Sequence, residues 1–195
     1  MPVLKAPALA ERLQRGAAAL FPTDTLPALA ACPEHADQIW RLKGRPQDKP
    51  LILMGADLEQ LRGALPLEWR PEWLALAESG WPGALTLVLP AAGAWVEALH
   101  PGGGSLGLRV PACEAARELL RLSGPLATTS ANRSGEPPAT SAPEAAALFP
   151  ELPLLGAVPW PEPSGQASTV ISWSDDGGWQ LLRAGAVLPP ELCAG

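Results

Sequence analysis

The sequence predicts an α/β fold, organised as one domain over residues 1–195 around a mixed β-sheet. Apolar runs such as Leu51–Met54 and Leu85–Leu89 have the length and composition of buried strands. Segments with apolar residues at helical spacing lie between them, and such a mixture of helices and strands is typical of α/β proteins. A chain of 195 residues with 47% hydrophobic residues is large enough to bury a core.

Six segments have the spacing and end signals of helices. In the first, Leu9 and Leu13 fall on one face, and Gly16 marks the end. Asp57 is a candidate N-cap for another, because its side chain can accept a bond from a free backbone N–H. The predicted helices are Ala6–Arg15, Glu34–Leu42, Asp57–Leu65, Pro71–Ser79, Glu114–Leu122 and Pro143–Phe149.

The strands are predicted from apolar runs and from alternation. In Ser105–Val110, alternation places Arg109 in phase with Ser105 and Gly107, on the face opposite the apolar residues. Two interpretations of this arginine stay open: an exposed residue on a short strand, or one that points into a cleft. The other predicted strands are Ala17–Phe21, Leu51–Met54, Leu85–Leu89, a strand starting at Pro125, and a hairpin of Ala167–Trp173 and Trp179–Arg183.

The loop Arg41–Pro50 concentrates positive charge before a predicted core strand. Four of the 14 Lys and Arg residues lie within nine positions of this loop, together with a glycine and two prolines that fix or free the backbone. A rigid cationic loop at the start of a buried strand suits anion binding. A solvated, basic helix end is the other interpretation, because cations favour helix C-termini.

Three further loops combine polar or small residues. Thr23-Asp24-Thr25 follows a predicted strand, where it can serve either as a ligand contact or as an ordinary Asx or Ser/Thr turn. Thr128–Gly135 offers small hydroxyl and amide groups that allow close approach by a phosphate. Gly102-Gly103-Gly104 precedes a strand and does not form GxGxxG. Because GxxxxGK[ST] is also absent, a nucleotide would need another cradle.

Charge and composition narrow the function classes. The net charge of −6 disfavours a broad nucleic-acid-binding face but leaves room for one cationic pocket. Cys32, Cys113 and Cys193 lack CxxC spacing, so neither a zinc site nor a disulfide framework is expected, and we predict no metal-ligating residues. No run approaches the roughly 18 apolar residues of a membrane span. The expected setting is a reducing cytoplasm without a membrane partner.

Taken together and in order, several stretches resemble the YrdC family. Any one of them is weak, whereas the ordered set covers nearly the whole chain. The stretches are Pro22-Thr23-Asp24-Thr25, Lys43-Gly44-Arg45-Pro46 with Lys49-Pro50-Leu51, Trp81–Thr86, Gly107-Leu108-Arg109-Val110-Pro111, Ser130-Ala131-Asn132-Arg133-Ser134-Gly135, Ser168-Thr169-Val170 and Leu182-Arg183-Ala184-Gly185.

The resemblance implies an open, twisted α/β sheet with flanking helices around a concave site. It also implies a threonylcarbamoyl-AMP synthase, an ATP-dependent nucleotidyltransferase that uses L-threonine and bicarbonate, with Mg²⁺ on the triphosphate. The product would serve tRNA modification, with tRNA or other modification proteins as further partners. Positioning and electrostatic stabilisation would dominate such a reaction, because two anions have to approach each other.

The resemblance also implies roles for individual residues. Lys43, Arg45, Ser130 and Asn132 match the catalytic tetrad that grips phosphate. Arg109 matches the arginine that holds the amino acid's carboxylate, for which a planar fork is suited. The remaining nucleotide contacts implied are Lys49, Ser105 and Arg183. The remaining threonine contacts implied are Thr23, Thr25, Thr128 and Ser168.

Two departures from the family pattern affect the amino-acid side. Members commonly continue the first motif as Tyr-Gly, where this chain has Pro27-Ala28, so an aromatic wall is either missing or supplied by a tryptophan. A histidine often stands where this chain has Met54. An adenylate-forming enzyme for another substrate therefore remains an alternative. An RNA-binding or ribosome-associated YrdC-like protein is the alternative from a different class.

Overall fold

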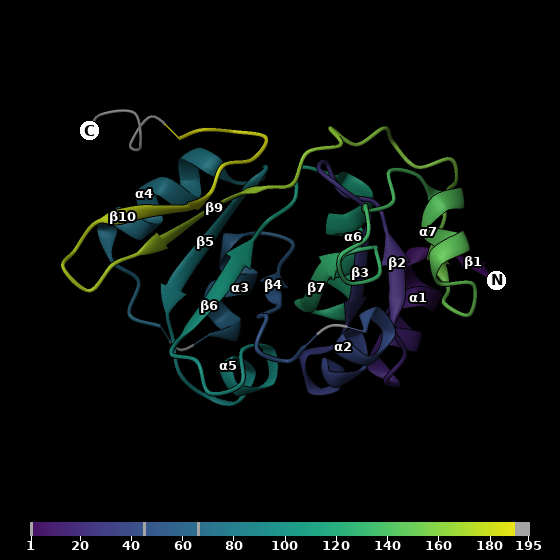
Figure 1. Cartoon of the computed structure of the whole chain (residues 1–195), viewed down its shortest axis with the longest axis horizontal. Helices are drawn as coiled ribbons and strands as arrows, with labels where there is room; N and C mark the ends of the chain where they lie inside the picture. Colours follow the sequence, from purple (N-terminus) through teal and green to yellow (C-terminus); the bar gives the residue numbers. More distant parts are fainter. Residues whose placement is uncertain (1, 45, 66, 190–195) are drawn as a thin grey trace.

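Ten strands form one mixed sheet in the computed structural model, which describes residues 2–44, 46–65 and 67–189 (Figure 1). The sheet contains parallel pairs such as β4 with β6 and antiparallel pairs such as β3 with β7. In spatial order, the strands are β1 (Val3–Leu4), β8 (Leu154–Leu155), β2 (Ala19–Phe21), β3 (Ala28–Ala31), β7 (Leu126–Ser130), β4 (Ile52–Met54), β6 (Ser105–Arg109), β5 (Leu85–Pro90), β9 (Thr169–Trp173) and β10 (Trp179–Arg183).

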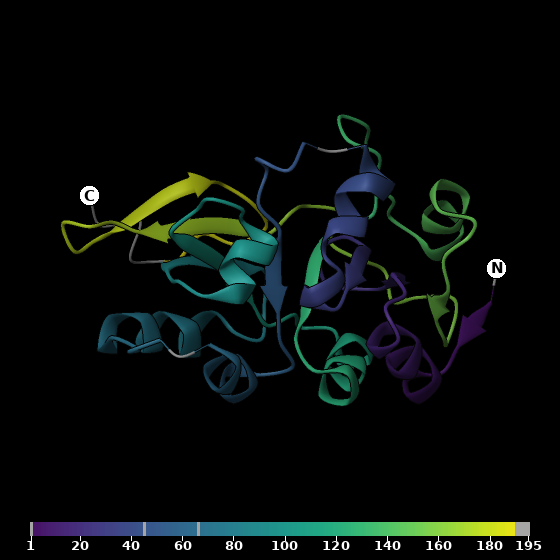
Figure 2. The ribbon, with the colours of Figure 1, turned by 90° about the horizontal axis from the view of Figure 1, so that it is seen from below.

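Helices flank the sheet. Figure 2 shows α1, α6, α3 and α4 along one face, with α2 on the other. The helices are α1 (Ala6–Gln14), α2 (Asp37–Lys43), α3 (Leu58–Ala64), α4 (Pro71–Gly80), α5 (Ala94–Leu99), α6 (Glu114–Ser123) and α7 (Ala142–Leu148), with a short 3-10 helix η1 (Pro33–His35).

Two clusters of buried apolar side chains hold these layers together. One packs α1 and α6 against the sheet through residues such as Leu13, Leu119 and Phe21. The larger one runs along the sheet from Leu20 on β2 through Leu108 on β6 to Ile171 on β9. Burying a side chain of this size stabilises the fold by about 1.5–3 kcal/mol each, which is why the apolar runs of the sequence become central strands.

All of the predicted helices and strands are present, and the predicted α/β class with a mixed sheet is confirmed. Asp57 caps α3 as expected, since its Oδ1 accepts from the backbone N–H of Gln60 at 2.8 Å. Strand β3 (Ala28–Ala31) was not predicted, nor were β1, β8 and α5. Alanine has low strand propensity, yet β3 is fully buried between β2 and β7, so tertiary packing decides its conformation.

Candidate functional site

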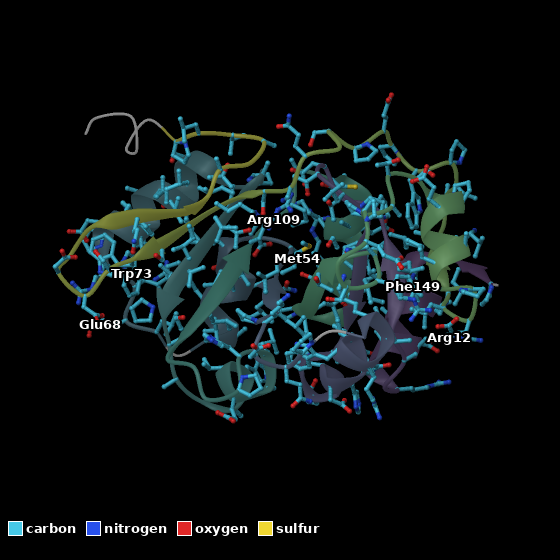
Figure 3. All side chains as sticks on the ribbon, viewed as in Figure 1. Arg12, Met54, Glu68, Trp73, Arg109 and Phe149 are labelled. Atoms are coloured by element: carbon cyan, nitrogen blue, oxygen red, sulfur yellow. The ribbon has the colours of Figure 1, made fainter. Side chains whose placement is uncertain are left out.

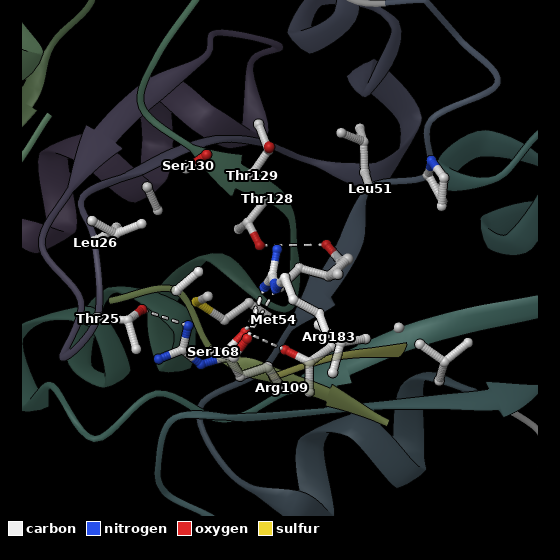
Figure 4. Close-up of a pocket in the computed structure, with 18 of the residues that line it drawn as sticks. Thr25, Leu26, Leu51, Met54, Arg109, Thr128, Thr129, Ser130, Ser168 and Arg183 are labelled. Atoms are coloured by element: carbon white, nitrogen blue, oxygen red, sulfur yellow. Dashed lines mark hydrogen bonds between the residues drawn. The ribbon is translucent and has the colours of Figure 1, made fainter. Parts of the chain in front are cut away.

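A cavity of about 430 Å³ opens over the middle of the sheet (Figure 4). Its walls combine apolar side chains with hydroxyl groups and two arginines, a mixture typical of small-molecule sites. The residues that line it are Thr23, Thr25, Leu26, Ala28, Pro50, Leu51, Ile52, Met54, Thr86, Val88, His100, Ser105, Gly107, Arg109, Thr128, Thr129, Ser130, Ala167, Ser168, Val170, Leu182 and Arg183.

Arg109 points into this cavity from the end of β6, as the cleft interpretation of the sequence expected. Its side chain lies beside Met54, the residue it pairs with in the sheet (Figure 3). Nη2 donates to Asp24 Oδ1 at 2.8 Å, Nη1 to Thr25 Oγ1 at 2.8 Å, and Nε to the Gly83 carbonyl at 3.1 Å. Burial lowers the pKa of Arg109, and the neighbouring Asp24 carboxylate opposes that shift.

Thr23 makes the hydrogen bonds of a turn, whereas the Thr25 hydroxyl lies at the cavity and accepts from Arg109. Thr23 Oγ1 donates to the Leu26 carbonyl at 2.7 Å and accepts from the Leu26 backbone N–H at 3.2 Å. The connection between β8 and β9 crosses the same loop. There the N–H of Ser164 donates to the Asp24 carbonyl at 2.9 Å, and the N–H of Gly165 donates to the Thr25 carbonyl at 3.1 Å.

Lys43, Ser130 and Asn132 come together although 87 or more residues separate the lysine from the others. Lys43 is the last residue of α2 and is 3% exposed. Its Nζ donates to the Ser130 carbonyl at 2.6 Å, and to the Asn132 carbonyl and Oδ1 at 2.8 Å each. Ser130 Oγ also donates to Asn132 Oδ1, at 2.7 Å. The buried ammonium thus fixes the end of β7.

The rest of the cationic loop does not join this cluster within the described residues. Arg45 lies outside the described residues. Lys49 is exposed and is not among the described residues that line the cavity, and its carbonyl accepts from Trp40 Nε1 at 3.0 Å. Arg41 pairs with Asp37 on the surface of α2, as expected of a helix-end charge.

Hydroxyl groups and a second arginine form the wall opposite Thr25. Thr86 and Ser168 hydroxyls lie 2.8 Å apart, and Arg183 Nη2 donates to the Ser168 carbonyl at 2.8 Å. Thr128, on β7, lines the same cavity and is 1% exposed. Arg183 adds positive charge close to Arg109, since it contributes to lowering the pKa of that residue.

Gly107 lines the cavity, and its lack of a side chain leaves space there. A Cβ at this position would meet Ile52 Cγ2 at 2.8 Å and Thr86 Cγ2 at 3.4 Å. Ser105, two residues earlier on β6, lines the cavity and offers its carbonyl to the His100 ring, 2.9 Å from Nδ1.

Strand register separates two ends of the cavity. Ile52 pairs with Gly107 on one side and with Thr128 on the other. Arg109 lies two residues beyond Gly107 in one direction, and Ser130 two residues beyond Thr128 in the opposite direction. These two residues are therefore about four strand positions apart, roughly 13 Å along the strands, and Figure 4 shows them on opposite sides.

Of the three residues that distinguish this chain from the family pattern, Ala28 and Met54 line the cavity, and Pro27 does not. Met54 contributes to the wall beside Arg109, whereas Ala28 pairs with Ser130 in the sheet and lines the other end, and no tryptophan is among the lining residues that the structure describes. The aromatic wall expected at this position is therefore not replaced by a tryptophan within the described chain.

Sequence reasoning missed Thr86 and His100 as cavity residues, and it missed Asp24 as the partner of Arg109. Asp24 stood inside a recognised motif, but nothing in the sequence paired it with Arg109. Among residues 2–44, 46–65 and 67–189, no group of three or more His, Cys, Asp or Glu side chains could hold a metal ion. No described helix is long and apolar enough to cross a membrane.

Comparison with known proteins places the chain among relatives of similar sequence and fold. The family model Sua5_yciO_yrdC, described as telomere recombination, matches residues 11–185. A threonylcarbamoyl-AMP synthase of Stenotrophomonas maltophilia is 40% identical over 135 residues, which is 65% of this chain and 71% of that protein. One of Bacillus subtilis is 38% identical over 184 residues, 88% of this chain and 51% of that protein.

A solved structure of Pyrococcus abyssi Sua5 complexed with L-threonine superimposes with a TM-score of 0.86 at 36% identity. The match covers 96% of this chain and 56% of that one, so the chain spans little more than half of the Bacillus and Pyrococcus relatives. The open mixed sheet, the ordered motifs and the match over residues 11–185 agree. The chain belongs to the Sua5/YciO/YrdC family.

Proposed function

We propose that this protein, acting as a single domain, is a threonylcarbamoyl-AMP synthase that uses L-threonine, bicarbonate and ATP. The observation that carries the proposal is one cavity with two distinct polar ends. Arg109 with Asp24 and Thr25 forms one end, and Ser130, held by Lys43, forms the other. An amino acid and a nucleotide triphosphate could therefore bind in one space with their reacting groups between these ends. Relatives that carry the same activity in their names support this proposal.

Arg109 is proposed to bind the carboxylate of threonine. A guanidinium has five N–H donors, and three of those in Arg109 donate to Gly83, Thr25 and Asp24. Within residues 2–44, 46–65 and 67–189, the other two donors have no partner and can serve a ligand, in an orientation that the three existing bonds fix. Thr25, with Thr23, Thr128 and Ser168, would surround the side chain and amine of the amino acid.

The chemistry begins with carbamate formation. Bicarbonate loses hydroxide to give CO₂, the amine nitrogen of threonine bonds to the carbon of CO₂ and loses a proton, and the hydroxide and proton leave as water. A carbamate oxygen then bonds to the α-phosphorus of ATP, the bond from that phosphorus to the bridging oxygen breaks, and pyrophosphate leaves. Negative charge accumulates on the phosphoryl oxygens, so preorganised donors are the main contribution expected of the protein.

Lys43, Arg45, Ser130 and Asn132 are proposed to form the phosphate-binding end, where the three N–H donors of Lys43 bond to Ser130 and Asn132. Lys43 contributes its charge and holds the segment from Ser130 to Asn132 in place. Lys49, Ser105 and Arg183 are proposed as further nucleotide contacts. Mg²⁺ would enter with the triphosphate as part of the substrate. Because the described residues offer no ligand cluster for a resident ion, we assign no step to a metal.

We further propose that the adenylate passes to other enzymes for modification of adenosine in tRNA, in the cytoplasm. The buried free thiols of Cys32 and Cys113 are consistent with that setting. A second candidate, adenylation of a carbamate from another amino acid, is favoured by the apolar Met54 in the wall beside Arg109.

The test is incubation with ATP, bicarbonate and labelled threonine, followed by detection of labelled adenylate and pyrophosphate. We expect equal amounts of both products, and loss of both in Lys43→Ala and Arg45→Ala. Repeating the assay with each of the other amino acids separates the two candidates. Wild-type turnover in either variant, with its fold intact by circular dichroism, would refute the proposed roles.

A further inference from the structure

The loop Gly102-Gly103-Gly104 holds an imidazole at the edge of the cavity. Gly103 packs so closely that a Cβ there would lie 2.3 Å from His100 Nδ1 and 2.4 Å from two ring carbons. The N–H of Gly103 donates to the His100 carbonyl at 2.8 Å. The loop therefore closes back on the histidine, and only a residue without a side chain leaves room for the ring.

His100 is oriented by a hydrogen bond of its own. Nδ1 lies 2.9 Å from the carbonyl oxygen of Ser105. Since a carbonyl only accepts, the proton is on Nδ1, and in the neutral ring Nε2 carries a lone pair. Within the described residues, Nε2 has no hydrogen-bond partner. His100 also provides the only aromatic ring among the described residues that line the cavity.

Strand register places His100 at the end of the cavity where Ser130 lies, the end proposed to bind phosphate. The backbone N–H of Leu51 donates to the Leu99 carbonyl at 2.8 Å, which joins the start of β4 to the residue before His100. Ser105 lies two residues before Gly107 on β6, the same direction along the strands in which Ser130 lies from Thr128. The neighbouring wall is apolar, formed by Pro50, Leu51 and Val88. An apolar wall with one fixed acceptor suits a heterocyclic base.

We propose that His100 selects the purine base by accepting a hydrogen bond at Nε2 from the 6-amino group of adenine. Adenine presents a donor at this position, whereas guanine presents an acceptor, O6. The lone pair of His100 would therefore attract the first base and repel the second. This inference rests on the proposed function, because it assumes that a nucleotide occupies the end of the cavity near Ser130.

Three nucleotides and four proteins test it. Titration calorimetry measures the binding of ATP, GTP and purine riboside triphosphate, the last of which carries hydrogen at C6. The proteins are wild type, His100→Ala, Gly103→Ala and Gly104→Ala. Wild type is expected to bind ATP about 3- to 10-fold more tightly than purine riboside triphosphate, the size of one net hydrogen bond. His100→Ala should bind the two equally and should bind GTP less poorly relative to ATP.

The glycine variants separate the imidazole from the loop. Gly103→Ala keeps the histidine but pushes the ring aside, so it should lose the preference as His100→Ala does. Gly104→Ala is the matched control, because its Cβ would meet no atom within 4 Å. A preference that survives in His100→Ala overturns the proposal. So does a loss in Gly104→Ala equal to that in Gly103→Ala, or a wild type that binds no purine nucleotide.

Failure of the proposed function and failure of the base contact give different results in the adenylate assay and in the binding titrations. A wild type that binds ATP selectively through His100 but makes no adenylate from threonine refutes the synthase and leaves the base contact standing. A wild type that makes adenylate, with His100→Ala equally selective, refutes the base contact alone.

Discussion

Asp24 and Arg109 form an ion pair across 85 positions of sequence, with 2.8 Å between Asp24 Oδ1 and Arg109 Nη2. The same oxygen accepts from the backbone N–H of Ala112 at 3.0 Å. The arginine side chain is 5% exposed and the aspartate side chain 18%. The carboxylate therefore joins the loop after β2 to the segment after β6, and it fixes the plane of the guanidinium.

We expect Asp24→Asn to weaken threonine binding because Arg109 loses the partner that orients it. The KM for threonine should rise about tenfold with little change in kcat, and the free energy of unfolding should fall by about 1–3 kcal/mol. Steady-state kinetics and urea denaturation measure the two effects. Asp37→Asn, which breaks only the exposed pair with Arg41, is the control. An unchanged KM in Asp24→Asn would contradict this role.

Lys43→Met should abolish adenylate formation and also destabilise the fold. The substitution removes the ammonium and leaves the carbonyls of Ser130 and Asn132 without this donor, a loss of about 1–3 kcal/mol for each buried group left unsatisfied. Arg41→Met, in the same helix but at the surface, should cost less than about 1 kcal/mol. Differential scanning calorimetry and the product assay compare them. Similar losses in both variants would show that the buried contacts are unimportant.

Gly107→Ala should reduce cavity space and strain the sheet. The added methyl group would press on Ile52 Cγ2 at 2.8 Å, and overpacking of this kind costs about 1–3 kcal/mol. Gly63→Ala, within α3, meets no atom within 4 Å and should instead stabilise by about 0.5–1 kcal/mol. Chemical denaturation gives the sign of each change. Equal effects at both positions would refute the close packing at Gly107.

Cys32 should make stability depend on alkaline pH. Burial, with a smaller effect from Glu34, raises the pKa of its thiol from 9.0 to about 11. Because the folded state binds the thiol proton more tightly, this contribution to stability is complete below pH 9 and is lost as pH rises through about 11. The difference in unfolding free energy between wild type and Cys32→Ala should therefore shrink over that range. Urea titrations at several pH values measure it, and a constant difference would count against a buried thiol.

The sequence predicted those parts of the fold that local signals determine. The cap at Asp57 and the alternation that puts Arg109 on one face with Ser105 and Gly107 are both local, and the structure has both. Strand β3 has no such signal, since Ala28–Ala31 becomes a strand only because β2 and β7 lie on either side.

The site was predictable as motifs but not as contacts. Thr25 and Arg109 were both identified, whereas their hydrogen bond depends on how β2 and β6 are placed in the sheet. His100 carried no signal as a lone histidine. The nearby glycines are visible in the sequence, but their close packing against the His100 ring depends on the folded structure.

The crossing of the β8–β9 connection over the Asp24–Thr25 loop has a consequence for synthesis on the ribosome. Ser164 and Gly165 bond to the backbone of this early loop, and β9 supplies the wall that carries Val170. A nascent chain that ends before about residue 170 therefore contains the Asp24–Thr25 loop but lacks the β9 wall of the cavity. Competence to bind substrate is acquired only after residues 164–183 have emerged, so products truncated before them would remain inert.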